Sequence, residues 1–340
     1  MSDARYVNGF SVIAEIAVNN GPIGGIAATA DGSRLITTNG NSVSVIDTRT
    51  CAVVQTITGI EEPFAVAMAA ADGDRVYVNT ASAAYDAVAV IDVRAAAVVG
   101  MHPLAFNVTD LAVSPDAKHV FASRTEGERA DIAIVDTTTH DVDVVEIAAA
   151  PGVTAQHARI SADGQRLYVA ANGPYDGRLV VIGARERHIV GSIQIGSPIR
   201  DVALSHDGST AYVASCGTDF SAVVDVVDIR TSMVTSTAKV LGIGRFVTQL
   251  ALSRDGDRAY LVSDSGVTVL SIYEQEIIGA ITARTQPSCV IESPDGRRLY
   301  VADYSGSVTV ASIASPIVQA ADEDITAGLP RLLMLEPALT

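Results

Sequence analysis

Residues 293–313 read SPDGRRLYVADYSGSVTVASI, and this stretch decides the fold of the chain. It contains an Asp-Gly pair, a strand-like Leu-Tyr-Val segment, a short polar connection and a second segment rich in β-branched residues. Asp-Gly favours a tight hairpin turn because glycine tolerates the positive φ that such a turn requires. Versions of this unit recur along the chain, so the fold is built from a repeated strand-turn-strand element.

The repeats keep a fixed register around the turn aspartate. Successive turn aspartates stand 40 to 48 residues apart: Asp31, Asp72, Asp116, Asp163, Asp207, Asp255 and Asp295. A large apolar or aromatic residue follows each of them after five positions: Ile36, Tyr77, Phe121, Tyr168, Tyr212, Tyr260 and Tyr300. Repeats of this length, each with four short β-rich segments, indicate the blades of a β-propeller.

The two ends of the chain predict how the ring closes. Val12–Val18 resembles the fourth strand of later units, and the seventh unit stops after its third strand at Ile313. We therefore predict an all-β, seven-bladed propeller of four-stranded antiparallel blades, in which residues 11–18 complete the blade of residues 289–313. Residues 1–313 would form one domain. Residues 314–340 would form an extension whose apolar run, Leu332–Leu335, packs on a blade or on a partner.

The repeat resembles that of a known family. Pro287–Asp303, PSCVIESPDGRRLYVAD, and its copies are similar to the YVTN repeat of bacterial and archaeal β-propellers, a relative of the WD repeat. The Tyr-Val-Thr-Asn tetrad has counterparts that start at Tyr77, Tyr168, Tyr212 and Tyr300. The resemblance covers about residues 11–313 and implies the seven-bladed fold, but little about activity. More distantly, the chain resembles the seven-bladed lactonases, although it lacks residues that match the acidic and basic positions of that family.

Composition excludes several classes of partner and site. The formal net charge of −16 and the pI near 4.6 argue against nucleic acid or an anionic membrane surface as partner. No apolar run reaches membrane-spanning length and no signal-peptide pattern is visible, so we expect a cytoplasmic monomer, or a secreted or periplasmic one if a leader was removed. Cys51, Cys216, Cys289 and the six histidines lack metal-ligand spacing, and no metal or cofactor is predicted.

Polar residues gather where the innermost strands of blades three to six begin. Blades one and two carry small or apolar residues there, such as Gly25 and Val66. Because the first strand lines the central channel of a propeller, the polar side chains should face that channel. They are Asp110, Gln156, His157, Arg159, Arg200, Asp201 and Gln249. They could form ion pairs between neighbouring blades or a ligand-binding site at the channel mouth; no spacing among them specifies a catalytic residue.

Longer connections between the second and third strands distinguish blades two to five. They span Thr80–Ala87, Arg124–Ala130, Asn172–Arg178 and Cys216–Ala222. Three aromatic residues, Tyr85, Tyr175 and Phe220, lie on these connections. Exposed aromatic side chains anchor protein interfaces, so these connections predict a protein-contact rim, unless they pack on themselves.

Two functions are compatible with this sequence. The first is a non-enzymatic scaffold that binds a protein or a small ligand through the channel mouth and the long connections. The alternative is a lactonase-like hydrolase in which a channel carboxylate and His157 act on a sugar lactone. A redox or metal-dependent propeller is disfavoured by the scattered His and Cys. We interpret the repeated strand-end carboxylates as turn caps rather than metal ligands: Asp47, Asp92, Asp136 and Asp228.

Overall fold

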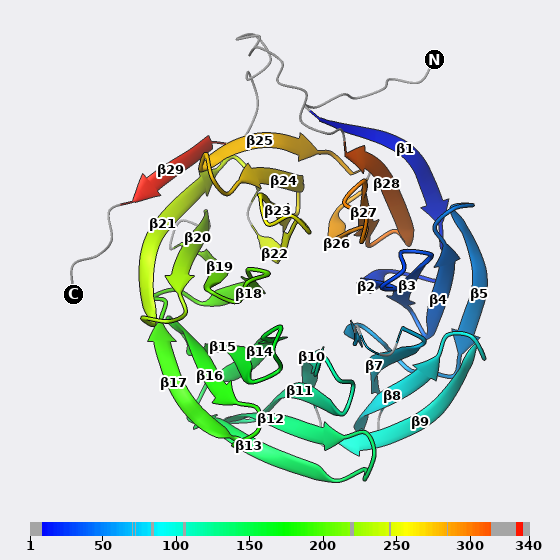
Figure 1. Ribbon diagram of the computed structural model, residues 1–340, viewed down its shortest axis with the longest axis horizontal. Coiled ribbons are helices and arrows are strands. Elements are labelled where there is room, and N and C mark those ends of the chain that lie inside the picture. Colours follow the sequence, from blue (N-terminus) through cyan, green and yellow to red (C-terminus); the bar gives the residue numbers. More distant parts are fainter. Residues whose placement is uncertain are drawn as a thin grey trace.

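A computed structural model of the chain describes residues 9–69, 71, 73–82, 85–104, 107–217, 221–244, 246–283, 285–313 and 331–335. The strands of these residues form seven antiparallel sheets, arranged like blades around a central axis (Figure 1). Six sheets have four strands and one has five. The predicted all-β, seven-bladed propeller is therefore confirmed.

The blades are numbered in the order of their innermost strands. Blade one contains β2 (Ile23–Ala28), β3 (Arg34–Asn39), β4 (Ser42–Asp47) and β5 (Ala52–Thr58). Blade two contains β6 (Val66–Met68), β7 (Arg75–Ala81), β8 (Asp86–Asp92) and β9 (Ala97–Leu104). Blade three contains β10 (Val108–Val113), β11 (His119–Glu126), β12 (Arg129–Asp136) and β13 (Val142–Ala149). Blade four contains β14 (Thr154–Ile160), β15 (Arg166–Asn172), β16 (Gly177–Gly183) and β17 (His188–Gln194).

The remaining blades include strands from both ends of the chain. Blade five contains β18 (Ile199–Leu204), β19 (Thr210–Cys216), β20 (Ala222–Asp228), β21 (Met233–Leu241) and β29 (Arg331–Leu335). Blade six contains β22 (Val247–Leu252), β23 (Arg258–Ser263), β24 (Gly266–Ser271) and β25 (Glu276–Ile281). Blade seven contains β26 (Pro287–Glu292), β27 (Arg298–Asp303), β28 (Ser307–Ile313) and β1 (Phe10–Ala17).

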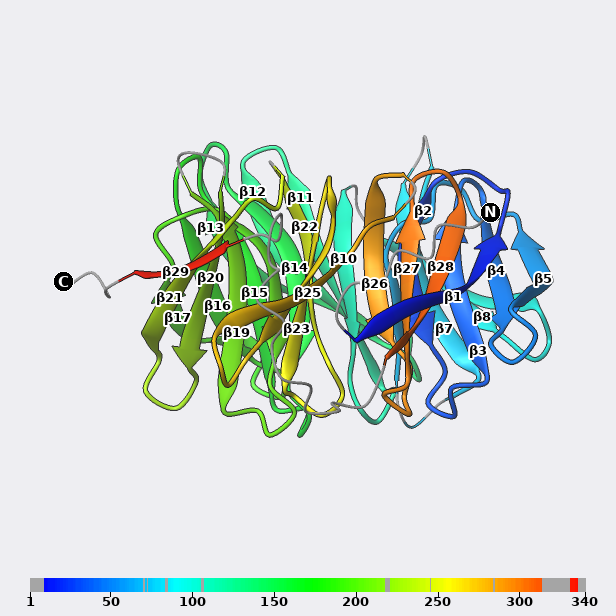
Figure 2. The same ribbon diagram turned by 90° about the horizontal axis from the view of Figure 1, so that it is seen from above.

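The meander inside each blade gives the ring two distinct faces. The first strand of each blade lies nearest the axis and the fourth lies outermost (Figure 1), and the blades stand side by side around the ring (Figure 2). Because consecutive strands are antiparallel, the turns from first to second and from third to fourth strand share one face. We call this the lower face. The connections from second to third strand, and those from one blade to the next, lie on the opposite, upper face.

The turn aspartates have the structural role that their spacing predicts. The Asp31 carboxylate accepts hydrogen bonds from the Ser33 backbone N–H at 3.0 Å and from the Thr29 hydroxyl at 2.6 Å. These hydrogen bonds lower the pKa of Asp31 to about 2. Gly32 has a φ of 68°, and Ala117 takes the same left-handed conformation, at 59°, in the one blade that lost the glycine. The strand-end carboxylates likewise accept backbone N–H groups of the following turn, as predicted: Asp47, Asp92, Asp136 and Asp228.

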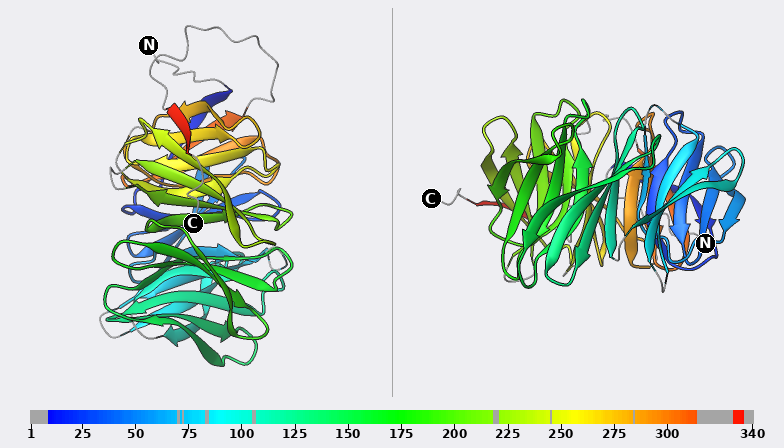
Figure 3. Two further views of the ribbon diagram at one scale, coloured as in Figure 1. Left: turned by 90° about the vertical axis from the view of Figure 1, so that its left-hand side faces the viewer. Right: turned by 90° about the horizontal axis from the view of Figure 1, so that it is seen from below.

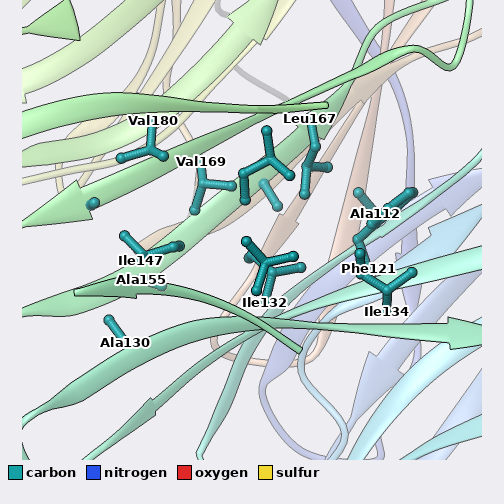
Figure 4. Packing of buried hydrophobic residues seen from close by; sticks show 14 residues of the cluster. Ala112, Phe121, Ala130, Ile132, Ile134, Ile147, Ala155, Leu167, Val169 and Val180 are labelled. Carbon is teal, nitrogen blue, oxygen red and sulfur yellow. The ribbon is translucent and has the colours of Figure 1, made fainter. Parts of the chain in front are cut away.

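The hydrophobic core consists of seven clusters, and each lies between two neighbouring blades. Between blades three and four, for example, Ile132 and Ile134 of β12 pack with Leu167 and Val169 of β15 (Figure 4). The fully buried aromatic Tyr77 of the repeat belongs to such a cluster as well. Each blade therefore buries both of its faces, and it does so only when it has a neighbour on either side.

The N-terminal strand closes the ring as predicted. β1 pairs with β28 from Phe10 opposite Ile313 to Ala17 opposite Ser307, with one irregularity between Val12 and Ala14. Phe10 joins the cluster between blades six and seven, while Ile16 joins the cluster between blades seven and one. The first and last parts of the described repeat are thus held in a single sheet (Figure 3).

The C-terminal apolar run also contacts a blade. β29 pairs in antiparallel fashion with β21, from Arg331 opposite Leu241 to Leu335 opposite Thr237. It adds a fifth strand to the outer edge of blade five (Figure 1). Residues 314–330 and 336–340 of the expected extension lie outside the described residues.

Deletion of residues 1–20 should destabilise the whole ring. It removes the pairing partner of β28 and the buried side chains Phe10, Ile16 and Val18, which we expect to cost roughly 5 kcal/mol or more of unfolding free energy. Urea denaturation followed by circular dichroism measures the effect. Deletion of residues 331–340 is the matched control, because it removes an outer strand and leaves the closure intact. If the 1–20 deletion and the intact chain unfold at the same urea concentration, β1 does not stabilise the ring by closing it.

Candidate functional site

The innermost strands surround a central cavity of about 720 Å³. Five of the predicted site residues line it: Asp110, His157, Arg159, Asp201 and Gln249. The opposite side of the cavity carries small or apolar residues of blades one and two, such as Gly25 and Val66. Gln156 and Arg200 are not among the lining residues; they precede His157 and Asp201 on the upper-face side of the same strands. The predicted contrast between a polar and an apolar side is therefore present in the cavity.

Arg159 connects three blades through two ion pairs. Its Nη1 atom lies 2.8 Å from Oδ2 of Asp110 in blade three, and its Nη2 atom lies 2.7 Å from Oδ1 of Asp201 in blade five. His157 Nδ1 lies 3.5 Å and 3.6 Å from the same two carboxylate oxygens. The Asp201 side chain is fully buried, so its ion pair with Arg159 is shielded from solvent.

The close packing of these charges shifts their protonation equilibria. Burial opposes ionisation of Asp110, but Arg159, His157 and the Ala158 backbone N–H hold the pKa of its carboxyl group at about 2. For His157, burial favours the neutral imidazole, yet the charges of Asp201 and Asp110 outweigh it and raise the pKa. The same carboxylates raise the pKa of Arg159. At neutral pH, Asp110 and Arg159 are therefore ionised, and His157 gains a proton more readily than a free histidine.

Three side chains at this level also bond their inner strand to the backbone of the following blade. Asp110 Oδ2 accepts the Ala158 N–H at 3.1 Å, and Asp201 Oδ2 accepts the Leu250 N–H at 2.9 Å. In blade six, Gln249 Oε1 accepts the Val290 N–H at 2.6 Å. These three side chains occupy one equivalent position, six residues before the turn aspartate. The geometry thus matches the structural interpretation for Asp110, Asp201, Gln249 and Arg159.

Arg200 differs from Arg159. Among the described residues, no carboxylate forms an ion pair with the Arg200 guanidinium group. The Nε atom of Arg200 is buried and has no hydrogen-bond partner. Pairing of Arg200 with a neighbouring aspartate is thus not observed, although sequence reasoning treated the two arginines alike. Within the described part of the chain, no group of three His, Cys, Asp or Glu side chains could hold a metal ion.

Glu292 is a polar residue of the cavity that the sequence analysis did not predict. Glu292, at the end of β26, lines the cavity and accepts a hydrogen bond from the Tyr260 hydroxyl at 2.5 Å and from the Arg254 N–H at 3.3 Å. Burial raises the pKa of Glu292. Its signal was present in the alignment of repeats, because the position three residues before the turn aspartate is apolar in the other blades: Ala28, Ala69, Val113, Ile160, Leu204 and Leu252.

The long connections of blades two and four present their aromatic residues to solvent. Tyr85 is 45% exposed and Tyr175 is 89% exposed, so neither connection packs its aromatic ring into the blade. Phe220 lies outside the described residues. Both tyrosines lie on the upper face, where the innermost strands begin.

Comparison with known proteins agrees with this architecture. The chain is 49% identical over 344 residues to the seven-bladed beta-propeller protein Rv1057 of Mycobacterium tuberculosis, across 92% of this chain and 87% of that protein. The chain belongs to the seven-bladed β-propeller proteins. A seven-bladed beta-propeller protein of Mycolicibacterium smegmatis is 38% identical over 69 residues, which is 20% of this chain and 19% of that one. No family model matches the chain, so the YVTN repeat stays a resemblance that this membership fits.

Solved structures support the fold alone. Hydrazine synthase of Kuenenia stuttgartiensis superposes with a TM-score of 0.76 at 21% identity, over 88% of this chain and 96% of that one. The β-propeller domain of Cps50 (Swd1) from Myceliophteria thermophila superposes with a TM-score of 0.71 at 13% identity. The match covers 90% of this chain and 100% of that one. Among the residues that the structure describes, there is no helix long and apolar enough to cross a membrane.

Substitution of Asp110 by Asn should weaken this propeller most at neutral pH. The folded-state pKa of about 2 lies below the ordinary value of 3.8, so the ionised carboxylate stabilises the fold above about pH 4 and ceases to do so as pH falls toward 2. We expect Asp110→Asn to lower the unfolding free energy by roughly 2–4 kcal/mol at pH 7, and by less at pH 3.

Urea denaturation at the two pH values measures this difference. Asp176→Asn, which changes an exposed carboxylate on the upper face, serves as the control. If Asp110→Asn lowers the unfolding free energy as much at pH 3 as at pH 7, loss of the ion pair with Arg159 is not the cause of the destabilisation.

Proposed function

We propose that this propeller is a non-enzymatic binding scaffold that holds a protein or a small ligand against its upper face. The observation that carries this proposal is the distribution of exposed aromatic side chains. In the described residues, the exposed Phe and Tyr side chains of the upper face are Phe64, Tyr85, Tyr175, Phe246 and Tyr304. Tyr273 is their counterpart on the lower face. Exposed aromatic groups combine a large apolar area with few rotatable bonds, which suits them to anchor a partner.

One of these aromatic residues also lines the central cavity, which favours a shared site. Phe64 lines the cavity and is 38% exposed, so it belongs to both the channel and the upper face. The ion pairs of Arg159 hold the neighbouring inner strands in one arrangement, and a preorganised rim lowers the entropy lost when a ligand binds. The upper face therefore combines a rigid polar channel with solvent-facing aromatic groups.

Substitution of the exposed tyrosines tests this proposal. We expect Tyr85→Ser combined with Tyr175→Ser to abolish capture of a ligand or partner protein that the wild-type protein retains. The matched control is Tyr273→Ser, because Tyr273 is 77% exposed but lies on the lower face. The measurement is affinity capture on immobilised protein followed by mass spectrometry, with binding of each retained species confirmed on purified components. Equal retention by all three proteins would overturn the assignment to the upper face.

A lactonase-like hydrolase is the second candidate, and the position of His157 between two carboxylates is what favours it. The electrostatics weigh against it. A general base needs a pKa near the working pH, whereas Asp110 has a pKa of about 2 and binds Arg159. We rank this function second for that reason.

A lactone panel separates the two functions. We expect no hydrolysis of sugar or aliphatic lactones above the buffer rate, measured by pH-indicator assay. Hydrolysis that the wild-type protein catalyses and His157→Ala loses would establish the hydrolase instead. Hydrolysis that survives in His157→Ala would point to a contaminating enzyme.

A further inference from the structure

Two connections on the upper face carry acidic and aromatic side chains where blades one and two meet (Figure 1). The connection from β5 to β6 carries Glu61, Glu62 and Phe64, and the connection from β7 to β8 ends with Tyr85. All four side chains are exposed, Phe64 to 38% and Tyr85 to 45%. We call these four residues the acidic aromatic patch.

Backbone hydrogen bonds hold the two connections side by side. The Ala81 N–H, at the end of β7, donates to the Glu61 carbonyl oxygen at 2.9 Å. The Glu61 N–H donates in turn to the Thr80 hydroxyl group at 3.1 Å. Directly after β7, the Ser82 N–H donates to the Tyr85 carbonyl oxygen at 3.2 Å and closes the turn that carries this tyrosine. The end of β7 therefore contacts both connections of the patch.

Two asparagine side chains hold the backbone of the other patch residues. The Phe64 N–H donates to Oδ1 of Asn79 at 2.9 Å, and Asn79 is fully buried on β7. The Glu62 N–H donates to Oδ1 of Asn41, in the connection from β3 to β4 of blade one, at 3.3 Å. A surface whose backbone is already held in place loses less entropy when a partner binds. The patch is therefore suited to docking without rearrangement.

The carboxylates of the patch have no basic partner. Among the described residues, no ion pair or hydrogen bond of the Glu61 or Glu62 carboxylate is found. Arg49 is the only Lys or Arg between residues 43 and 74, and it lies in the lower-face turn between β4 and β5. Residues 76–93 contain no Lys or Arg. The patch therefore places two uncompensated negative charges beside two aromatic rings.

The lower face lacks this combination. Its turn aspartates accept hydrogen bonds from their own turns, as Asp31 does from the Ser33 N–H at 3.0 Å. The lower-face turns of every blade also contain at least one Lys or Arg, whereas the upper-face connections of blades one and two contain none. The exposed carboxylates of the patch are therefore free to pair with charges of another molecule.

Carboxylates beside exposed aromatic rings favour a cationic partner. A Lys or Arg side chain forms ion pairs with carboxylates and is attracted to the face of a Tyr or Phe ring. An anionic partner would be repelled by Glu61 and Glu62, and an apolar partner would bury both charges without a counter-charge. The net charge of −16 also attracts cationic molecules over a longer range.

We propose that the acidic aromatic patch binds a segment of a partner protein that is rich in Lys or Arg. The inference rests on the proposed function and adds the charge of the partner. Glu61 and Glu62 pair with the basic side chains of the segment, and Phe64 and Tyr85 pack against them. Phe64 also lines the central cavity, so the segment lies beside the channel.

Fluorescence anisotropy with labelled peptides tests the charge of the partner. In the three peptides, Arg, Glu or Leu alternates with Gly-Ser. They are titrated with the wild-type protein, Glu61→Gln/Glu62→Gln, Tyr85→Ser and the control Glu274→Gln/Glu276→Gln. Glu274 and Glu276 are exposed on the lower face of blade six, so the control changes the net charge by the same amount.

We expect the wild-type protein to bind the Arg peptide, and to bind it less tightly as salt is raised. The substitution of both patch glutamates should weaken this binding at least about fivefold, Tyr85→Ser about threefold, and the control less than about twofold. Thermal unfolding without peptide shows whether the variants fold. Because the substituted side chains are exposed, their melting temperatures should stay within about 2 °C of the wild-type value.

Several results would overturn the basic partner. They are absence of Arg-peptide binding up to about 1 mM, and binding of the Glu or Leu peptide as tightly as the Arg peptide. An equal loss in the lower-face control would show attraction to the net charge alone and also overturn it. If the double glutamine variant does not fold, unchanged binding by Tyr85→Ser overturns the patch. If the patch fails while tyrosine-dependent capture is intact, the scaffold function stands.

Discussion

Burial between neighbouring blades is the constraint on which the rest of this structure depends. The seven clusters of buried apolar residues each join two blades, so a single blade has no core of its own. A row of such blades would expose an apolar face at either end. Closing the row into a ring removes both ends at once, and β1 contributes buried residues to the clusters on either side of blade seven. The channel geometry follows from this closure, because the ring sets how closely the inner strands approach.

Two adjacent positions of the inner strand have separate roles. Asp110, Asp201 and Gln249 bond to backbone N–H groups of the following blade, and Arg159 joins both carboxylates. The charges of Asp110, Asp201 and Arg159 therefore contribute to the architecture. The residue immediately before them stands on a bulge and is released from the ladder. The side chain that bonds to the next blade and the side chain on the bulge are therefore neighbours in the sequence.

The fold was predictable because its signals are local and repeated. The turn at Asp31 depends only on Gly32 and on the neighbouring Thr29 hydroxyl group. Because such turns recur every 40 to 48 residues, the sequence predicts a series of similar blades. The different surroundings of Arg159 and Arg200 were not predictable from their neighbours in sequence. They depend on which groups of the next blade lie close enough to pair with each side chain. They also depend on a β-bulge, which no residue type in the sequence indicates. Glu292 was overlooked for another reason, since its apolar counterparts in other repeats become informative only once the repeats are aligned position by position.

The pairing of β1 with β28 has a consequence for synthesis of the chain. Ser11 and Ser312 bond to each other across 301 residues, so β1 is synthesised long before the strand with which it pairs. At ribosomal rates of about 5–20 residues per second, β1 waits for about 15–60 s before β28 emerges. During that interval the exposed edge and the apolar side chains Phe10 and Ile16 are open to other nascent chains. Polysomes, on which many copies are made side by side, are therefore the setting in which this protein is most prone to exchange its first strand with a neighbour.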